Sequence, residues 1–319
     1  MQNNLLYRIH TGKQHGIIPS TISEDIKMIV APDSSSNNFF EHEYLKTVKG
    51  IDVLVIDHHE AEKISEYGCI INNQLCDYPT KSLSGVGMVY KFCSYIDEIL
   101  NTKYAENFLD LVALGMVADM MDLRDFETKH LIMQGLKKIR NPYFNGMCKR
   151  NSYSLGDEIT PIGIAFYIAP YVNATIRVGT QEEKLILFES MLDHKNFELV
   201  PSTKRGCKGQ METKVEQACR NCINIKNRQT KARDVSLNKI EQIIQEQNLL
   251  SNKILVVKLD PELCIEKNLT GLIANQLMSK YQKPVLLLHK VVHYNNIDNN
   301  EWNQWLIKKG YLKTQFKDG

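Results

Sequence analysis

An acid and two histidines come directly after an apolar run in this chain. Residues 53–56 are all apolar, and Asp57, His58 and His59 follow them. A short, fully apolar run rich in β-branched residues predicts a strand covered on both faces, which is typical of the centre of an α/β sheet. Ligands of such sheets bind outside the carboxyl ends of the strands, and a carboxylate with neutral imidazoles suits Mn, Zn or Fe. A helix cap at Asp57 followed by two surface histidines fits the tripeptide equally well.

Two further acids stand at the end of, or inside, apolar segments. Residues 27–33 form a second apolar run that ends at Asp33. Residues 111–125 predict a buried helix whose apolar run is interrupted by Asp119. A lone acid in so apolar a helix is costly unless it is paired or binds a metal. Asp33 and Asp119 therefore join Asp57 and the two histidines as candidates for one site.

Glycines and histidines elsewhere offer weaker signals for phosphate binding. Ser84, Gly85 and Gly87 open a predicted helix, where glycine allows phosphate to approach backbone N–H groups. Tight packing of that helix on a sheet explains the glycines about equally well. His10 and His15 lie near a predicted strand over residues 4–10 and are within reach of a phosphate, but we favour ordinary loop residues.

The elements that position these residues alternate between strand and helix patterns, which predicts parallel strands joined by right-handed crossovers. A second α/β unit is predicted over residues 253–288. The strands are expected near 27–31, 53–56 and 69–72, and the helices near 39–48, 86–100, 106–118, 126–139 and 161–170.

Composition excludes several classes of protein. The chain has 319 residues, 43% of them hydrophobic, and a formal net charge of +2, so it is not a disordered polyanion or polycation. No apolar run approaches the ~20 residues of a membrane span, and no signal-peptide apolar region opens the chain. Eight scattered cysteines suit reduced thiols in a cytoplasm better than a disulfide framework.

Positive charge is concentrated in residues 201–234. This segment holds nine basic and three acidic residues, so it carries +6 in a chain whose total is +2. Such an asymmetry favours contact with a polyanion, with Lys204, Arg205 and Lys208 beside glycines in a flexible loop. A merely basic linker helix is the alternative. Cys219 and Cys222 lack the further ligands of a structural zinc site and are interpreted as packing residues.

Five motifs in this order resemble the DHH phosphoesterase superfamily, and most closely its RecJ branch of single-strand-specific 5′ exonucleases. The resemblance implies a parallel-sheet DHH catalytic domain over residues 1–180, a basic helical linker over 181–250 and a partial second α/β, DHH-associated domain over 251–319. The family's N-terminal Asp-x-Asp and C-terminal Gly-His motifs are not found, so we expect a version clipped at both ends. The motifs lie at residues 33–35, 57–59, 84–87, 113–119 and 173–179.

The resemblance implies that the protein hydrolyses single-stranded DNA with two Mn²⁺ or Mg²⁺ ions. It also implies no membrane association and makes a single-strand-binding protein a candidate partner. Metal ligands would be Asp33, His58 and Asp119, with Asp57, His58 and His59 in catalysis and Asp57 orienting the histidines. Two alternatives remain. The first is another DHH phosphoesterase that acts on short RNA, cyclic dinucleotides or pyrophosphate, and the second is a catalytically impaired nucleic-acid-binding remnant. Substrate contacts are expected from His59, Ser84, Gly85, Gly87, Asn173, Arg177, Lys204, Arg205 and Lys208.

Overall fold

A computed structural model describes residues 7, 16–289 and 300–311 of the chain. It contains two compact units, one formed by Met1–Ala169 with Asn296–Gly319 and the other by Pro170–Asn295. The sequence predicts domain boundaries at residues 180 and 250, and these boundaries stay a prediction. His10, His15 and the predicted strand at 4–10, apart from Tyr7, lie outside the described residues.

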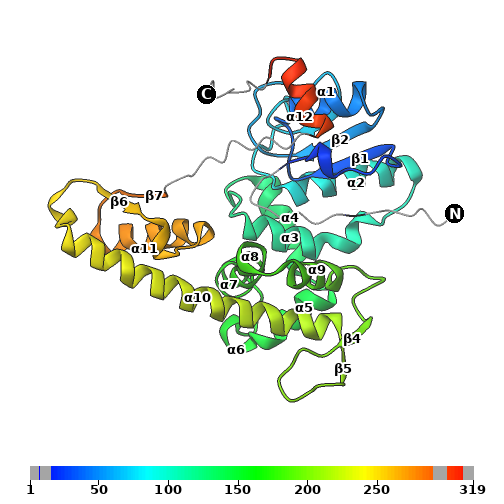
Figure 1. Cartoon of the computed structure of the whole chain (residues 1–319). Coiled ribbons are helices and arrows are strands. Elements are labelled where there is room, and N and C mark those ends of the chain that lie inside the picture. The colour runs from blue at the N-terminus through cyan, green and yellow to red at the C-terminus, as the bar shows by residue number, and fades with distance from the viewer. Residues whose placement is uncertain (1–6, 8–15, 290–299, 312–319) are drawn as a thin grey trace. The chain divides into compact units, whose positions relative to one another are not determined.

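A three-stranded parallel sheet forms the centre of the first unit (Figure 1). Its strands are β1 (Met28–Pro32), β2 (Asp52–Asp57) and β3 (Cys69–Asn72), and β2 lies between the other two. Residues 53–57 are all buried, which fits the central strand predicted from their composition. Helix α1 (Phe39–Thr47) connects β1 to β2. The strands are parallel as predicted, and residues 58–68, for which no helix was predicted, cross from β2 to β3 without one. Eleven residues are shorter than a usual helical crossover.

Helices complete the first unit. α2 (Gly85–Leu100) packs on β2, and α3 (Leu109–Ala118) lies between α2 and α4 (Phe126–Leu136). The apolar sequence of α3 suits this position, because neighbours cover it on more than one side. Short helices complete this part: α5 (Pro142–Arg150), α6 (Ser152–Leu155), α7 (Pro161–Tyr167), η1 (Pro19–Thr21) and η2 (Ala105–Phe108).

The last described helix, α12 (Glu301–Lys308), returns to the first unit and lies beside α1 (Figure 1). The ring centroids of Trp302 and Trp305 lie 5.0 and 5.3 Å from that of Tyr44, in edge-to-face geometry. Lys309 adds an ion pair with Glu43 at 2.7 Å. The sequence offered no interpretation of this segment, and the structure shows that its two tryptophans pack against the buried cluster that contains Tyr44 and Leu45 of α1.

The second unit is organised along one long helix, α10 (Lys214–Glu246). The expected second α/β unit is present, with parallel strands β6 (Leu255–Leu259) and β7 (Val285–His289) and helix α11 (Thr270–Tyr281) between them. Its core joins the end of α10, through Ile240 and Ile244, to β6 and α11. The remaining elements are α8 (Ala169–Val178), α9 (Gln181–Ser190), β4 (Leu199–Pro201), β5 (Met211–Thr213), η3 (Leu249–Ser251), η4 (Pro261–Leu263) and η5 (Lys267–Leu269).

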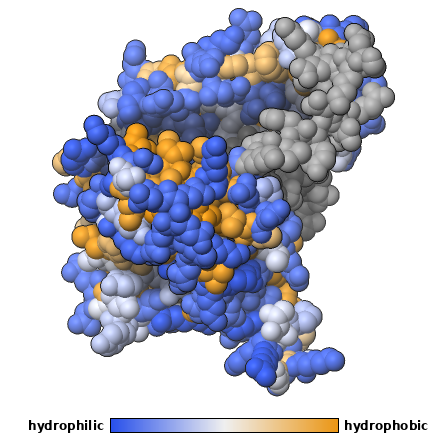
Figure 2. All heavy atoms as spheres, turned by 60° about the vertical axis from the view of Figure 1, so that its left-hand side comes forward, coloured by the Kyte–Doolittle hydropathy of each residue, from blue (hydrophilic) through white to orange (hydrophobic). Residues whose placement is uncertain are grey.

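The surface mixes hydrophilic side chains with exposed apolar patches on the face that Figure 2 shows. Among the described residues, no helix combines the length and the apolar character needed to cross a bilayer. All eight cysteines lie among the described residues, and none of them forms a disulfide. Cys219 and Cys222 are buried on one side of α10, so they pack as the sequence indicated.

Candidate metal centre

Asp33 is presented by a sharp turn at the end of β1. Its φ is 59°, and that of Ser35 is 84°, so two non-glycine residues adopt the left-handed region within three positions. Such conformations cost free energy and persist where surrounding contacts enforce them. Here Oδ1 of Asp33 lies 3.2 Å from Nε2 of His58, and the N–H of Ser36 donates to Asp57 at 3.1 Å. The turn thus brings the end of β1 onto the end of β2.

Asp57 is buried at the end of β2 and holds the histidines in place. Its Oδ1 accepts from the N–H of His58 at 2.8 Å and lies 2.7 Å from Nδ1 of His59. Burial alone would raise the pKa of Asp57, but hydrogen bonds from His59, Ser36 and His58 outweigh it and hold that pKa below its usual range. Because Nδ1 of His59 contacts Asp57, Nε2 of His59 is the ring nitrogen that can coordinate a metal ion.

Asn72 joins this arrangement from the end of β3. It pairs with Asp57 in the sheet register, and its amide donates to Oγ of Ser36 at 2.8 Å and to the backbone oxygen of His59 at 2.9 Å. Neither Ser36 nor Asn72 was predicted from the sequence to belong to the site. Asn72 could have been found by the argument used for Asp33 and Asp57, since it also stands where a strand of the same sheet ends.

Asp33, His58 and His59 form a possible ligand set. Each offers a ligand atom, and these atoms all lie within 4.8 Å of one another. Ligands of one ion, each about 2.1 Å from it, lie at most roughly 4.2 Å apart, so only small side-chain movements are needed. The hydrogen bond to Asp33 raises the pKa of His58 although burial opposes it. A carboxylate and two imidazoles fit Mn²⁺ or a similar divalent ion.

Asp119 follows the end of a helix, as the predicted range 106–118 implies, and does not lie inside the buried helix predicted over residues 111–125. The helix ends at Ala118, so Asp119 caps α3 and is exposed instead of interrupting a buried helix. Met120 follows with a φ of 55°, which turns the chain away. Asp119 is not one of the set within 4.8 Å, yet it is close enough that its charge acts on His58. Partial desolvation, and then the charge of Asp33, raise the pKa of Asp119.

The start of α2 closes on Asp33. A Cβ added at Gly85 would meet Oδ1 of Asp33 at 2.2 Å, so only glycine allows the carboxylate this position. A Cβ at Gly87 would meet Leu83 and Met116 at 3.4 Å or more. Close approach therefore explains Gly85, and helix packing explains Gly87. The buried Oγ of Ser84, at the N-cap, has no hydrogen-bond partner among the described residues.

The other predicted substrate residues belong to the second unit. Asn173 and Arg177 lie in α8, while Lys204, Arg205 and Lys208 are exposed in the loop between β4 and β5. The +6 of this segment overstates its free charge. Lys214 and Arg228 pair with carboxylates that lie outside the segment and were not counted in the +6, while Arg220 and Arg233 pair with carboxylates inside it.

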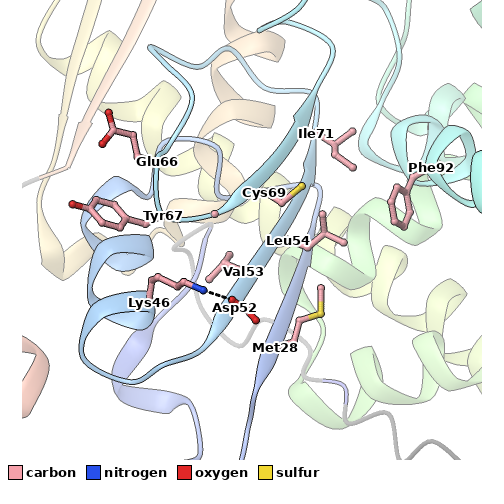
Figure 3. Close-up of a pocket in the computed structure, with 11 residues that line it drawn as sticks. Met28, Lys46, Asp52, Val53, Leu54, Glu66, Tyr67, Cys69, Ile71 and Phe92 are labelled. Atoms are coloured by element: carbon pink, nitrogen blue, oxygen red, sulfur yellow. Dashed lines mark hydrogen bonds and ion pairs between the residues drawn. The ribbon is translucent and has the colours of Figure 1, made fainter.

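The pocket drawn in Figure 3 is a separate feature of the first unit. It measures about 560 Å³ and is lined by Met28, Asp52 and Cys69, with Phe92 of α2 nearby. These three residues begin β1, β2 and β3. The pocket therefore lies at the amino ends of the strands, whereas Asp33, Asp57 and Asn72 stand at their carboxyl ends.

A parallel α/β sheet with an acid–histidine cluster at its carboxyl edge defines the class of this protein, and residues 2–116 match the DHH family, N-terminal domain. In sequence and fold the chain is similar to RecJ-type members of that superfamily. It is 43% identical, over 289 residues, to YorK of Bacillus subtilis strain 168, described as a candidate single-strand DNA-specific exonuclease from the SPbeta prophage; the match covers 89% of this chain and 49% of YorK. Identity to RecJ of the same organism is 25%, covering 75% of this chain and 28% of RecJ.

Solved structures show the same fold. A crystal structure of exonuclease RecJ bound to manganese matches with a TM-score of 0.66 at 21% identity, covering 86% of this chain and 64% of that one. RecJ of Thermus thermophilus in complex with Mn²⁺ matches with a TM-score of 0.65 at 19% identity, covering 82% of this chain and 36% of that one. The chain spans about half the length of YorK and a smaller fraction of the length of RecJ.

Proposed function

We propose that this chain is a metal-dependent phosphodiesterase that degrades single-stranded DNA as a RecJ-like 5′ exonuclease. The observation that carries the proposal is the convergence of Asp33, His58 and His59, from the ends of two neighbouring strands, within 4.8 Å. The relatives named as single-strand DNA-specific exonucleases support the substrate. Structures of RecJ with Mn²⁺ and with Mg²⁺ support either ion as the cofactor.

Each residue of the centre has a distinct role in this proposal. Asp33, His58 and His59 would hold a divalent ion, which supplies Lewis-acid activation of water and of the phosphodiester when bound. Asp57 fixes the tautomer and orientation of His59 through Nδ1. The exposed carboxylate of Asp119 adds negative charge beside His58 and favours a cation there.

Substrate contacts come from both units in this proposal. In the first unit, the N-terminus of α2 at Ser84 and Gly85 offers backbone N–H groups to a phosphate next to Asp33. In the second unit, Asn173, Arg177 and the exposed basic loop at 202–210 would contact the sugar–phosphate backbone. Cysteines that form no disulfide support a cytoplasmic location. The resemblance adds a single-strand-binding protein as a candidate partner.

Degradation of end-labelled oligonucleotides tests the function. With millimolar Mn²⁺ or Mg²⁺, the protein should release mononucleotides from the 5′ end of a single strand and leave a blunt duplex intact. Chelator should abolish this activity, and Asp33→Asn or His58→Ala should lower it at least ~100-fold. His130→Ala, at an exposed histidine of α4, is the matched control. Release from a cyclic dinucleotide but not from DNA would replace the proposal by a small-nucleotide phosphoesterase, and binding of DNA without cleavage would leave only a binding protein.

A further inference from the structure

Three cationic side chains of the second unit gather between α8 and α10. Oγ1 of Thr175 lies 3.2 Å from Sγ of Cys222, and the guanidinium of Arg228 donates to the backbone oxygen of Val178 at 3.3 Å. These two contacts place Arg177 level with the part of α10 between residues 222 and 228. Lys226 is four residues after Cys222, on the same side of the helix. Arg233 continues that side, seven residues further on.

Lys226 differs from the other basic residues of α10 in what surrounds it. Glu189 and Glu198 pair with Lys214, and Glu183 pairs with Arg228. The ammonium of Lys226 instead donates to the amide oxygen of Gln229 at 3.0 Å. Burial, followed by the positive charges of Arg233 and Arg177, lowers its pKa. Among the described residues, no carboxylate pairs with Lys226.

A group of like charges destabilises the folded chain unless something neutralises it. Arg233 has only its exposed neighbour Asp234 as an acidic partner among the residues that the structure describes. Gln229, which is 3% exposed, fixes the ammonium of Lys226 instead of neutralising it. Arg177 is exposed, so an anion can reach the group from solvent. Planar guanidinium groups beside an ammonium match the geometry and charge of a phosphate.

We propose that Lys226, Arg177 and Arg233 form a phosphate-binding subsite for the sugar–phosphate backbone of single-stranded nucleic acid. The proposal rests on the proposed function and deepens it, because it adds Lys226 and Arg233 of α10 to Arg177 and the exposed loop at 202–210, which that function already places against the backbone. A subsite built from these side chains carries no information on base identity, so binding there is independent of sequence.

Fluorescence anisotropy with a labelled single-stranded oligonucleotide over a salt series tests the subsite, with chelator present to prevent cleavage. Lys226→Gln should weaken binding roughly tenfold, as expected for loss of one hydrogen bond to a charged group. It should also flatten the salt dependence by about 0.7, the value for one phosphate contact on a single strand. Lys231→Gln, at an exposed lysine of the same helix, should leave both unchanged. An unaltered salt dependence in Lys226→Gln would overturn the subsite.

Thermal melting separates a binding role from a structural one. Removing Lys226 relieves repulsion in the free protein, so Lys226→Gln should melt at the same or a higher temperature while binding DNA more weakly. A lower melting temperature with unchanged DNA binding would show that Lys226 only supports the fold. Inorganic pyrophosphate, at ionic strength matched with chloride, should raise the melting temperature of the native chain more than that of Lys226→Gln.

The pyrophosphate measurement also distinguishes the two proposals. If the native chain binds single-stranded DNA without cleaving it, and pyrophosphate stabilises it more than the variant, the subsite holds and the proposed function fails. If DNA is cleaved but pyrophosphate stabilises both proteins equally, the subsite is rejected and the proposed function stands.

Discussion

Gly85→Ala should separate metal binding from folding. The added Cβ would lie 2.2 Å from Oδ1 of Asp33 and 2.5 Å from both its Cβ and Cγ. Cβ atoms essentially never make non-bonded contacts below 3.0 Å, so the carboxylate oxygen must move by at least 3.0 minus 2.2, or 0.8 Å. Rotation of the carboxylate does not solve this, because Cβ of Asp33 is also too close. The clash therefore displaces Asp33 itself, or α2, from the observed position.

Gly85→Ala should weaken Mn²⁺ binding far more than it lowers the free energy of unfolding. A displacement of about 1 Å in a functional group lowers activity roughly 100-fold, and we expect a similar loss of Mn²⁺ affinity. Overpacking costs about 1–3 kcal/mol of folding free energy, and replacing a helical glycine by alanine returns up to about 1 kcal/mol. The melting temperature should therefore change by only a few degrees while metal binding is largely lost.

Isothermal titration with Mn²⁺, together with thermal melting, checks this expectation. Gly87→Ala is the matched control on the same helix turn, because its added Cβ would meet its nearest neighbours at 3.4 Å, an ordinary contact. That variant should bind Mn²⁺ like the native chain and be equally or slightly more stable. If Gly85→Ala bound Mn²⁺ with native affinity, Asp33 would not be a ligand in the position described.

Three further predictions concern other parts of the chain. Burial lowers the pKa of His42 to about 4 from an ordinary 6.5, so the unfolded chain takes up a proton before the folded chain does as pH falls. The free energy of unfolding should therefore fall as pH drops from 6.5 to 4, and the loss should reach about 2 kcal/mol at pH 5. Urea unfolding should show this loss in the native chain and not in His42→Leu. Asn72→Ala, which frees Ser36 and the backbone of His59, should weaken Mn²⁺ binding about 10- to 100-fold by titration, and unchanged affinity would contradict the role given to the end of β3. Replacing Lys204, Arg205 and Lys208 together by alanine should flatten the salt dependence of DNA binding by roughly 2, about 0.7 per phosphate contact, and an unchanged salt series would show that the loop is a solvated connection.

The strands were predictable because each is short, apolar and followed by polar residues that mark its end. The same pattern located Asp33 and Asp57, since the carboxyl ends of parallel strands share one edge. The predicted helix at 106–118 ends where α3 ends, but the interpretation of residues 111–125 as one buried helix around Asp119 was wrong, because an apolar run alone does not reveal where a helix stops. The charge of residues 201–234 was overestimated because Glu183, Glu189 and Glu198, which neutralise part of it, lie outside that stretch of sequence.

The return of α12 to α1 has a consequence for how the chain folds. The ion pair between Lys49 and Glu301 joins residues 252 positions apart. Contacts of such long sequence separation form slowly, because a large loop must close before any of them is made. Both tryptophans of the chain lie in α12. Tryptophan emission during refolding should therefore report the arrival of this helix, and should lag behind the far-ultraviolet circular dichroism that follows the earlier helices.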